Sequence, residues 1–314
     1  MCRYSPWLPL LLLCAAFSGV TGCGLFVKQI PEGKPTSETP ADRFVKIDGI
    51  RYHYQAYPGA GKTIFLLHGF GSSTYTWERM IPCLTQAGFS VYALDMKGFG
   101  WSDKPKDVAY DPYTLMEEVN RWMETVKLSH VVFVGNSLGG AIAWLMALEH
   151  PDKVWRLVLV DAAAYPIRKP FPLNMAQVPL AGPMAKLFFS RSVVRWTLEK
   201  VYYHDDWVTE AQVTAYFDRL RAGNGLDAQL AIAKALDANQ FGQYIDRIPF
   251  IDKETLIIWG EEDEWISLDA VGRRLERELP NARLKTIPSC GHVPQEEYPK
   301  ETARLVIDFV AHIP

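Results

Sequence analysis

The chain has 314 residues, of which 48% are hydrophobic and 22% are charged. This composition supplies enough apolar side chains for a large core, in one domain or two. The formal net charge is −3 and no polybasic tail is present, which argues against a nucleic acid as a partner.

The first 22 residues have the pattern of a secretory signal peptide. Arg3 precedes the apolar stretch LPLLLLCAAF, which is too short to span a bilayer comfortably, and the small-residue sequence VTGC follows. VTGC resembles the cleavage box of bacterial lipoproteins, whose cysteine becomes the lipid-modified first residue of the mature chain. The alternative is an ordinary cleaved signal. We expect a signal peptide over residues 1–22, lipid on Cys23, and an exported lipoprotein anchored to a membrane of the bacterial cell envelope.

Residues 23–42 lack apolar periodicity and contain several prolines, glycines and hydroxyl residues. This composition is typical of a tether between a membrane anchor and a folded domain. With the signal removed and Cys23 lipidated, Cys83 and Cys290 are the remaining cysteines, so no disulfide framework is expected. The two thiols could pair or stay free.

A sheet is predicted to begin at Arg43, where RFVKI and IRYHYQAY are separated by Asp48-Gly49, a strong hairpin signal. Apolar strand candidates then alternate with helical patterns. The strands are TIFLL, VYALD, VVFVG, LVLVD, TLIIWG and RLKTI, and the helices lie near 76–87, near 113–127, after Ser137, near 268–279 and near 299–312. This alternation predicts an α/β fold, with helices covering a mostly parallel sheet formed by residues 43–164 and 248–314.

Residues 165–247 contain no convincing strand and separate the two halves of the predicted sheet. Their helical patterns are rich in Phe, Met, Trp and Leu, and they include Val193–Tyr203 and a segment that opens at Thr209. Thr209 and Gln212 fit a capping box at the start of that segment. An all-helical insertion between two halves of one sheet predicts a helical lid over the top of the sheet.

The strand VVFVG ends in Gly135-Asn136-Ser137-Leu138-Gly139, and a helical pattern follows. So abrupt a joint strains the backbone of its central residue, and the neighbours two positions away must be nearly free of side chain to avoid collision. Gly135 and Gly139 meet this requirement. The arrangement matches the G-x-S-x-G nucleophile elbow, which exposes a serine hydroxyl at the top of a sheet beside a helix N-terminus. The alternative is a turn made flexible by its glycines.

Serine is a weak nucleophile unless a base accepts its proton and an anion orients that base. His292 lies in SCGHVPQEE, between the RLKTI strand and the last helix, and Asp263 lies in WGEEDEW, just after the TLIIWG strand. Loops that follow parallel strands meet at one edge of the sheet, so Ser137, Asp263 and His292 can come together. Asp161, at the end of LVLVD, is the main competitor for the acid, and the spacing from Gly260 favours Asp263.

The chain resembles the α/β-hydrolase family in five motifs that occur in order from about residue 44 onward: LLHGF, DMKGFGWSD, VGNSLGG, WGEED and CGHVPQEE. The resemblance implies Ser137 as nucleophile, Asp263 as acid and His292 as base. The oxyanion formed on attack needs preorganised N–H donors, which we expect from Leu138 at the helix start and from Phe70 in the HGF loop.

The resemblance also suggests roles for two other residues of these motifs. His68 is expected to support the HGF loop by hydrogen bonding rather than to transfer protons. Asp95, which opens DMKGFGWSD, is interpreted as structural. The sequence has no phosphate loop, no metal-ligand motif and no dinucleotide fingerprint, so we expect no cofactor and no metal.

The residue at the elbow limits which reactions are possible. Relatives that displace halide or open epoxides carry Asp at the elbow, so Ser137 argues against both reactions. Carboxylic ester hydrolysis, carbon–carbon bond hydrolysis of dienoic ring-fission products, peroxidase-like side activity and a non-catalytic binding function remain. The HGFGSSTYTW loop is more similar to esterases, so we predict a serine esterase or lipase that acts on a small-molecule apolar ester. A dienoate would need a cation in the lid, for which the candidates are Arg168, Lys169, Arg191 and Arg195.

Overall fold

The structure is a computed structural model that describes residues 39–166, 186–236 and 242–311. The signal peptide, Cys23 and most of the tether lie outside these residues, and so do Arg168 and Lys169. Cys83 and Cys290 lie within them, and both are free thiols. In the described part of the chain, no helix combines the length and the apolar character needed to cross a membrane.

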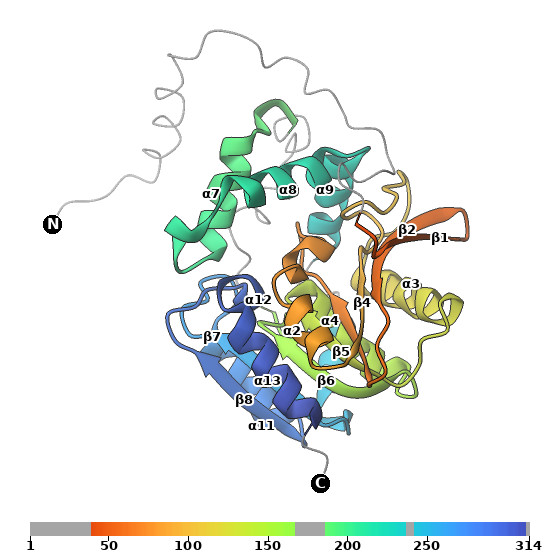
Figure 1. Ribbon diagram of the computed structural model, residues 1–314, viewed down its shortest axis with the longest axis vertical. Coiled ribbons are helices and arrows are strands. Elements are labelled where there is room, and N and C mark those ends of the chain that lie inside the picture. The colour runs from red at the N-terminus through yellow and green to blue at the C-terminus, as the bar shows by residue number, and fades with distance from the viewer. Residues whose placement is uncertain (1–38, 167–185, 237–241, 312–314) are drawn as a thin grey trace, which may run out of the picture.

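An eight-stranded sheet forms the centre of the molecule (Figure 1), with the strand order β1-β2-β4-β3-β5-β6-β7-β8. The β1–β2 and β2–β4 pairs are antiparallel, and every other pair is parallel. The strands are β1 (Asp42–Ile47), β2 (Ile50–Tyr57), β3 (Thr63–Leu67), β4 (Ser90–Leu94), β5 (Val131–Asn136), β6 (Val154–Val160), β7 (Thr255–Gly260) and β8 (Ala282–Ile287). The predicted α/β fold with a mostly parallel sheet is confirmed.

The hairpin that opens the sheet has the predicted turn. Asp48 and Gly49 connect β1 to β2, with φ values of 50° and 85°. A two-residue turn of type I′ needs positive φ at both central positions, which Asp and Gly tolerate better than most residues. Ile47 and Ile50 therefore pair directly across the turn.

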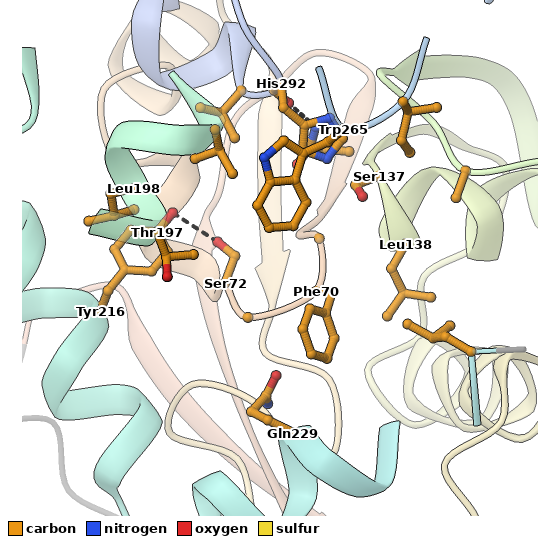
Figure 2. A pocket seen from close by; sticks show the side chains of 18 of the residues that line it. Phe70, Ser72, Ser137, Leu138, Thr197, Leu198, Tyr216, Gln229, Trp265 and His292 are labelled. Carbon is orange, nitrogen blue, oxygen red and sulfur yellow. Dashed lines mark hydrogen bonds between the residues drawn. The ribbon is translucent and has the colours of Figure 1, made fainter. Parts of the chain in front are cut away.

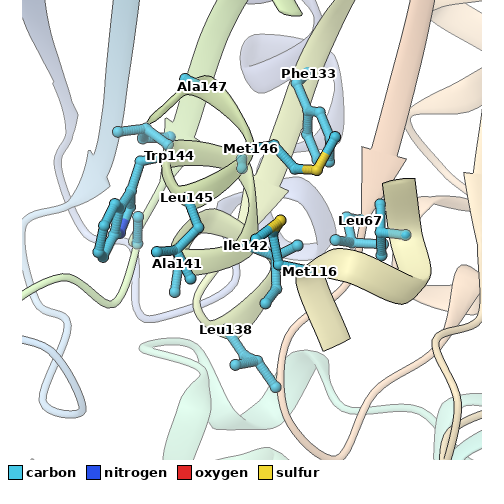
Figure 3. Close-up of a cluster of buried hydrophobic side chains, with 14 of the residues drawn as sticks. Leu67, Met116, Phe133, Leu138, Ala141, Ile142, Trp144, Leu145, Met146 and Ala147 are labelled. Carbon is cyan, nitrogen blue, oxygen red and sulfur yellow. The ribbon is translucent and has the colours of Figure 1, made fainter. Parts of the chain in front are cut away.

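Helices cover both faces of the sheet, and each face has its own apolar core. α3 (Pro112–Thr125), α4 (Leu138–Glu149) and α11 (Arg273–Glu278) pack into one core, and α2 (Ile81–Gln86) and α13 (Pro299–Ala311) pack into the other. α4 is buried from its first residue to Ala147, among side chains from the sheet and from α3 (Figure 3). Because α4 is fixed by this packing, the residue that precedes it is fixed as well.

Two predicted helices are interrupted. The helix expected near 76–87 is divided into the 3₁₀ helix η1 (Thr74–Trp77) and α2, which has Pro82 in its first turn. Proline lacks a backbone N–H and is favoured only where a helix begins, so a new helix starts there. The helix expected near 268–279 begins with a wider π-helical turn, η5 (Leu268–Gly272), and continues as α11.

The helices of the insertion lie together at one end of the molecule, beyond the central sheet (Figure 1). They are α7 (Arg191–Val201), η2 (Asp205–Trp207), α8 (Glu210–Arg221) and α9 (Gly225–Ala235). The chain then returns to the core through α10 (Gly242–Ile245) and η4 (Ile248–Phe250), whose Tyr244, Ile245 and Ile248 join the apolar cluster of α3 and α4. At the start of α8, the Thr209 hydroxyl accepts a bond from the Gln212 N–H, and the Gln212 side chain accepts one from the Thr209 N–H. The predicted capping box is therefore present.

Candidate active site

Ser137 occupies the joint between β5 and α4. Its backbone has φ 52° and ψ −116°, a strained conformation that a non-glycine residue keeps only when its surroundings fix it. The Ser137 N–H donates to the carbonyl of Val160 on β6 at 3.0 Å. The Ser137 carbonyl accepts bonds from the N–H groups of Ala141 and Ala163 at 3.1 and 3.0 Å. A strand, a helix and a loop thus hold the serine in place.

The glycines on either side of Ser137 are required by close backbone contacts. A Cβ atom added at Gly135 would lie 2.2 Å from the carbonyl oxygen of Gly139. A Cβ atom added at Gly139 would lie 2.2 Å from the carbonyl oxygen of Leu67, at the end of β3. Both distances are far below van der Waals contact, so neither position accepts a side chain, as the elbow motif predicts.

Asp263 and His292 meet after β7 and β8. His292 Nδ1 and Asp263 Oδ2 are 2.7 Å apart, and both side chains are buried. The other oxygen of Asp263 accepts bonds from the N–H groups of Trp265 and Ile266 at 2.7 and 3.0 Å. Because the carboxylate can only accept, His292 Nδ1 carries the proton and Nε2 is left as an acceptor. The Trp265 ring stacks on the His292 ring, with centroids 5.9 Å apart.

Asn136 ties the elbow to the loop of His292. Its side-chain amide donates to the backbone carbonyl of His292 at 3.1 Å and to that of Val160 at 3.2 Å. Asn136, which directly precedes Ser137, therefore fixes the backbone at His292. Asn136 was not among the residues predicted for the site, although its position within the elbow motif was a signal.

Asp161 lies beside the same group but does not bond His292. Its Oδ1 accepts the N–H of Gly260 at 3.1 Å. Ligand atoms of Asp161, Asp263 and His292 all lie within 4.8 Å of one another, a spacing that could suit a metal ion. The oxygens of Asp263, however, already accept three N–H groups, so these side chains form a hydrogen-bonded acid–base cluster. Burial and the neighbouring Asp263 charge raise the pKa of Asp161 well above its ordinary value.

His68 is fully buried beneath the loop that follows β3. The Met96 N–H donates to His68 Nε2 at 3.2 Å, so Nδ1 carries the proton and donates to the carbonyl of Gly69 at 2.8 Å. Burial lowers the pKa of His68, which keeps the ring neutral. Both ring nitrogens are used in holding this loop, which carries Phe70.

The loop of Phe70 runs directly beside the nucleophile. A Cβ atom added at Gly69 would lie 3.1 Å from Ser137 Cβ. Leu138 is the first residue of α4, where a backbone N–H has no partner within the helix. Phe70, Ser137 and Leu138 line one cavity. That the N–H groups of Phe70 and Leu138 form an oxyanion hole stays a prediction.

The cavity has a volume of about 290 Å³ and lies between Ser137 and the insertion (Figure 2). Its walls come from the loop after β3, the elbow, α7, α8, α9 and the loops of Trp265 and His292. Most lining side chains are aliphatic or aromatic, among them Phe70, Leu138, Phe189, Val193, Val194, Leu198, Val201, Leu220, Leu226, Trp265, Ile266 and Val293. Within the described residues, no Lys, Arg, Asp or Glu lines it.

Glu296 of α12 (Pro294–Glu297) links the insertion to the core. Its buried carboxylate accepts hydrogen bonds from Tyr202 at 2.7 Å, from Gln212 at 3.3 Å and from Tyr216. Tyr216 also bonds Ser72, in the loop of Phe70, at 3.1 Å (Figure 2). This group was not predicted from the sequence, because its members are far apart along the chain and form no local pattern.

Comparisons with known proteins agree with this geometry. The sequence profile of the alpha/beta hydrolase fold matches residues 62–299. The chain is 28% identical over 276 residues to the uncharacterized hydrolase YugF of Bacillus subtilis (strain 168), a match that covers 87% of this chain and 98% of that protein. It is 27% identical over 283 residues to 2-hydroxy-6-oxononadienedioate/2-hydroxy-6-oxononatrienedioate hydrolase 1 of Pseudomonas putida, covering 88% of this chain and 99% of that enzyme.

A solved structure of a membrane phospholipase A, described as a bacterial virulence factor, is similar in fold. Its TM-score is 0.71 at 27% sequence identity, with 86% of this chain and 85% of that chain covered.

Proposed function

Because the chain belongs to the alpha/beta hydrolase fold family, we propose that it is a serine hydrolase that cleaves carboxylic esters with apolar acyl groups through an acyl-enzyme. The observation that carries this proposal is that Ser137 and His292 line one apolar cavity, while Asp263 bonds the other nitrogen of the His292 ring. Acyl transfer to serine requires a nucleophile, a base and an anion that orients the base. An intact set of this kind also argues against a purely binding role.

The reaction follows from the direction of the hydrogen bonds. The Nδ1–H group of His292 donates a hydrogen bond to Asp263, so Nε2 can accept the proton of the Ser137 hydroxyl. Ser137 Oγ then attacks the ester carbonyl, and the N–H groups of Phe70 and Leu138 stabilise the oxyanion. The proton held by His292 passes to the leaving alcohol. His292 then takes a proton from water, which attacks the acyl-enzyme. As the bond between the acyl carbon and Oγ breaks and the carboxylic acid leaves, His292 returns the proton to Ser137 Oγ.

The apolar lining supports an acyl group as the part of the substrate that is buried. Each methylene that leaves water contributes about 0.8 kcal/mol, so a longer acyl chain should raise kcat/KM by at most about fourfold per methylene until the cavity is full. One solved structure similar to this chain is that of a membrane phospholipase A. That likeness supports an ester substrate for this protein.

Carbon–carbon bond hydrolysis is the second candidate, because relatives such as the P. putida enzyme are named for dienedioate substrates. A dienedioate carries two carboxylates, which would need cationic or strong hydrogen-bonding partners if buried. The described lining offers no such cation. Arg191 and Arg195 instead pair with Glu210 at 2.9 and 2.5 Å, which favours the ester.

A substrate comparison tests the proposal. With the full chain in detergent, kcat/KM is measured for p-nitrophenyl esters of increasing acyl length and for a vinylogous diketo acid. We expect efficient ester turnover that rises and then levels off with chain length, and little turnover of the diketo acid. Efficient turnover of the diketo acid, with ester rates several orders of magnitude lower, would select the carbon–carbon hydrolase.

The location of the protein is a separate proposal. The VTGC box and the proline-containing tether support a lipoprotein anchored through Cys23 to a membrane of the cell envelope. An anchor of this kind would bring the cavity close to membrane lipids, where apolar esters are concentrated.

A further inference from the structure

Asp161 is a fully buried carboxyl group that the proposed reaction does not use. It directly follows β6, and its φ of 42° is in the left-handed region that non-glycine residues avoid. Oδ1 accepts one bond, from the Gly260 N–H. Oδ2 is buried and has no hydrogen-bond partner among the described residues. An unpartnered oxygen in such a position indicates a proton that the heavy atoms alone do not reveal.

The carboxylate of Asp263 lies beside Asp161. The polar atoms of Asp161, Asp263 and His292 lie within 4.8 Å of one another. Two buried carboxyl groups this close do not both ionise. Asp263 accepts three N–H groups and Asp161 only one, so the negative charge is better stabilised on Asp263. Burial, followed by the charge of Asp263, raises the pKa of Asp161, in agreement with this assignment.

We propose that Asp161 is a neutral acid that donates a hydrogen bond from Oδ2 to Asp263, and that it thereby acts as a positioning residue for the carboxylate that orients His292. The role in catalysis depends on the proposed function, whereas the hydrogen bond itself does not. A donor behind Asp263 limits the basicity of that carboxylate and fixes its orientation. Asp161 therefore influences the base through Asp263 and does not touch the substrate.

Two other ionisable side chains influence the pair formed by Asp161 and Asp263. Glu297 on α12 and Cys290 in the His292 loop act electrostatically on Asp161 or Asp263. Burial raises the pKa of the Cys290 thiol, which is therefore neutral. Burial also raises the pKa of Glu297, although three backbone N–H groups oppose that shift. Neither side chain is changed in the variants proposed below.

Two substitutions of Asp161 separate its charge from its hydrogen bond. Asp161→Asn keeps an acceptor for Gly260, a donor for Asp263 and zero charge, and Asp161→Leu has similar size but no donor. The readout is the downfield Nδ1 proton signal of His292 and the pH midpoint of its ring titration, measured by NMR on the full chain. We expect Asp161→Asn to keep the signal with the midpoint within about 0.3 pH units of the wild type, and Asp161→Leu to raise the midpoint by about one pH unit.

Each result that would contradict the proposal has its own meaning. A midpoint lowered by about one pH unit in Asp161→Asn would mean that a negative charge had been removed, so Asp161 would be ionised. An unchanged midpoint in Asp161→Leu would mean that no hydrogen bond reaches Asp263. If Asp161→Leu does not fold, the infrared carbonyl band of a protonated carboxylic acid shows whether Asp161 is neutral. The wild type should show a band that Asp161→Asn lacks, and its absence from the wild type would overturn the proposal. These readouts need no substrate, so failure of ester hydrolysis leaves them interpretable.

Discussion

His53 shows how a single buried side chain, away from the nucleophile, can control stability. Its Nδ1 lies 2.7 Å from Asp95 Oδ2, and its Nε2 lies 3.1 Å from Asp42 Oδ1. Burial opposes the charged ring, but the charges and hydrogen bonds of these carboxylates outweigh it and raise the pKa of His53 to about 9. Asp95 also accepts the N–H groups of Thr74 and Trp101 at 2.6 and 2.8 Å, so its structural interpretation agrees with the contacts.

The charged His53, held by Asp95 and Asp42, should make the free energy of unfolding decrease as the pH becomes alkaline. The pKa of His53 is about 9 in the folded protein and about 6.5 when unfolded, so its contribution is complete below pH 6.5 and is lost as pH rises through 9. We expect the free energy of unfolding to fall by about 3 kcal/mol over this range. Urea unfolding at pH 7 and pH 10 measures the loss. His53→Gln should remove most of it, and His150→Gln is the matched control. An equal loss in both variants would contradict the assignment.

Asp263 should be far more important for turnover than other acidic residues nearby. Asp263→Asn removes the anion that fixes the His292 tautomer, so we expect kcat to fall by roughly 10³–10⁴-fold. Asp269→Asn is the control, because Asp269 lies in the same connection and is almost fully exposed. Ester hydrolysis by the two purified variants provides the measurement. Nearly full activity in Asp263→Asn would show that another residue orients the base.

The elbow between β5 and α4 depends on glycine at Gly139. In Gly139→Ala the new Cβ would meet the carbonyl oxygen of Leu67 at 2.2 Å, so α4 would have to move away from β3. We expect a loss of at least about 3 kcal/mol in the free energy of unfolding, or no soluble protein. Gly242→Ala is the control, since no atom lies within 4 Å of its added Cβ. Equal melting temperatures for the two variants would contradict the close contact.

Elements with a local cause could be predicted from the sequence, and contacts between distant segments could not. Asp48-Gly49 determines its own turn, and Thr209 with Gln212 determines the start of α8. The division of the first helix also had a local signal, in Pro82. By contrast, the bond from Asn136 to the His292 carbonyl and the bonds around Glu296 join segments at least 80 residues apart. No periodicity or motif spacing encodes such bonds.

Within the whole molecule, the insertion is attached directly to the loop of the base. The His292 N–H donates to the carbonyl of Val201, the last residue of α7, at 2.8 Å. The Trp265 indole donates to the carbonyl of Lys200 at 2.9 Å, and Glu297 accepts the N–H of Tyr203 at 3.0 Å. The end of α7 is thus part of the support of the acid–base pair. We expect motion of a lid to involve parts of the insertion other than the end of α7.

Lipidation would determine where the molecule works. Two or more acyl chains on Cys23, each methylene contributing about 0.8 kcal/mol, suffice for a stable anchor. We expect Cys23→Ser to abolish incorporation of labelled fatty acid and to release the protein from membranes. Cys83→Ser, which alters a free thiol of the folded domain, should retain the label. A mature N-terminus at another residue, found by mass spectrometry, would refute the anchor.

The most direct test of the account is to trap the acyl-enzyme. The full chain is mixed with p-nitrophenyl butyrate, quenched in acid within one turnover, digested and analysed by peptide mass spectrometry. We predict one butyryl group on the peptide that contains Ser137, located on that serine, and none on the same peptide of Ser137→Ala. A butyryl group on another residue, or ester turnover by Ser137→Ala at nearly the wild-type rate, would contradict the claim that this protein is a serine hydrolase acting through Ser137.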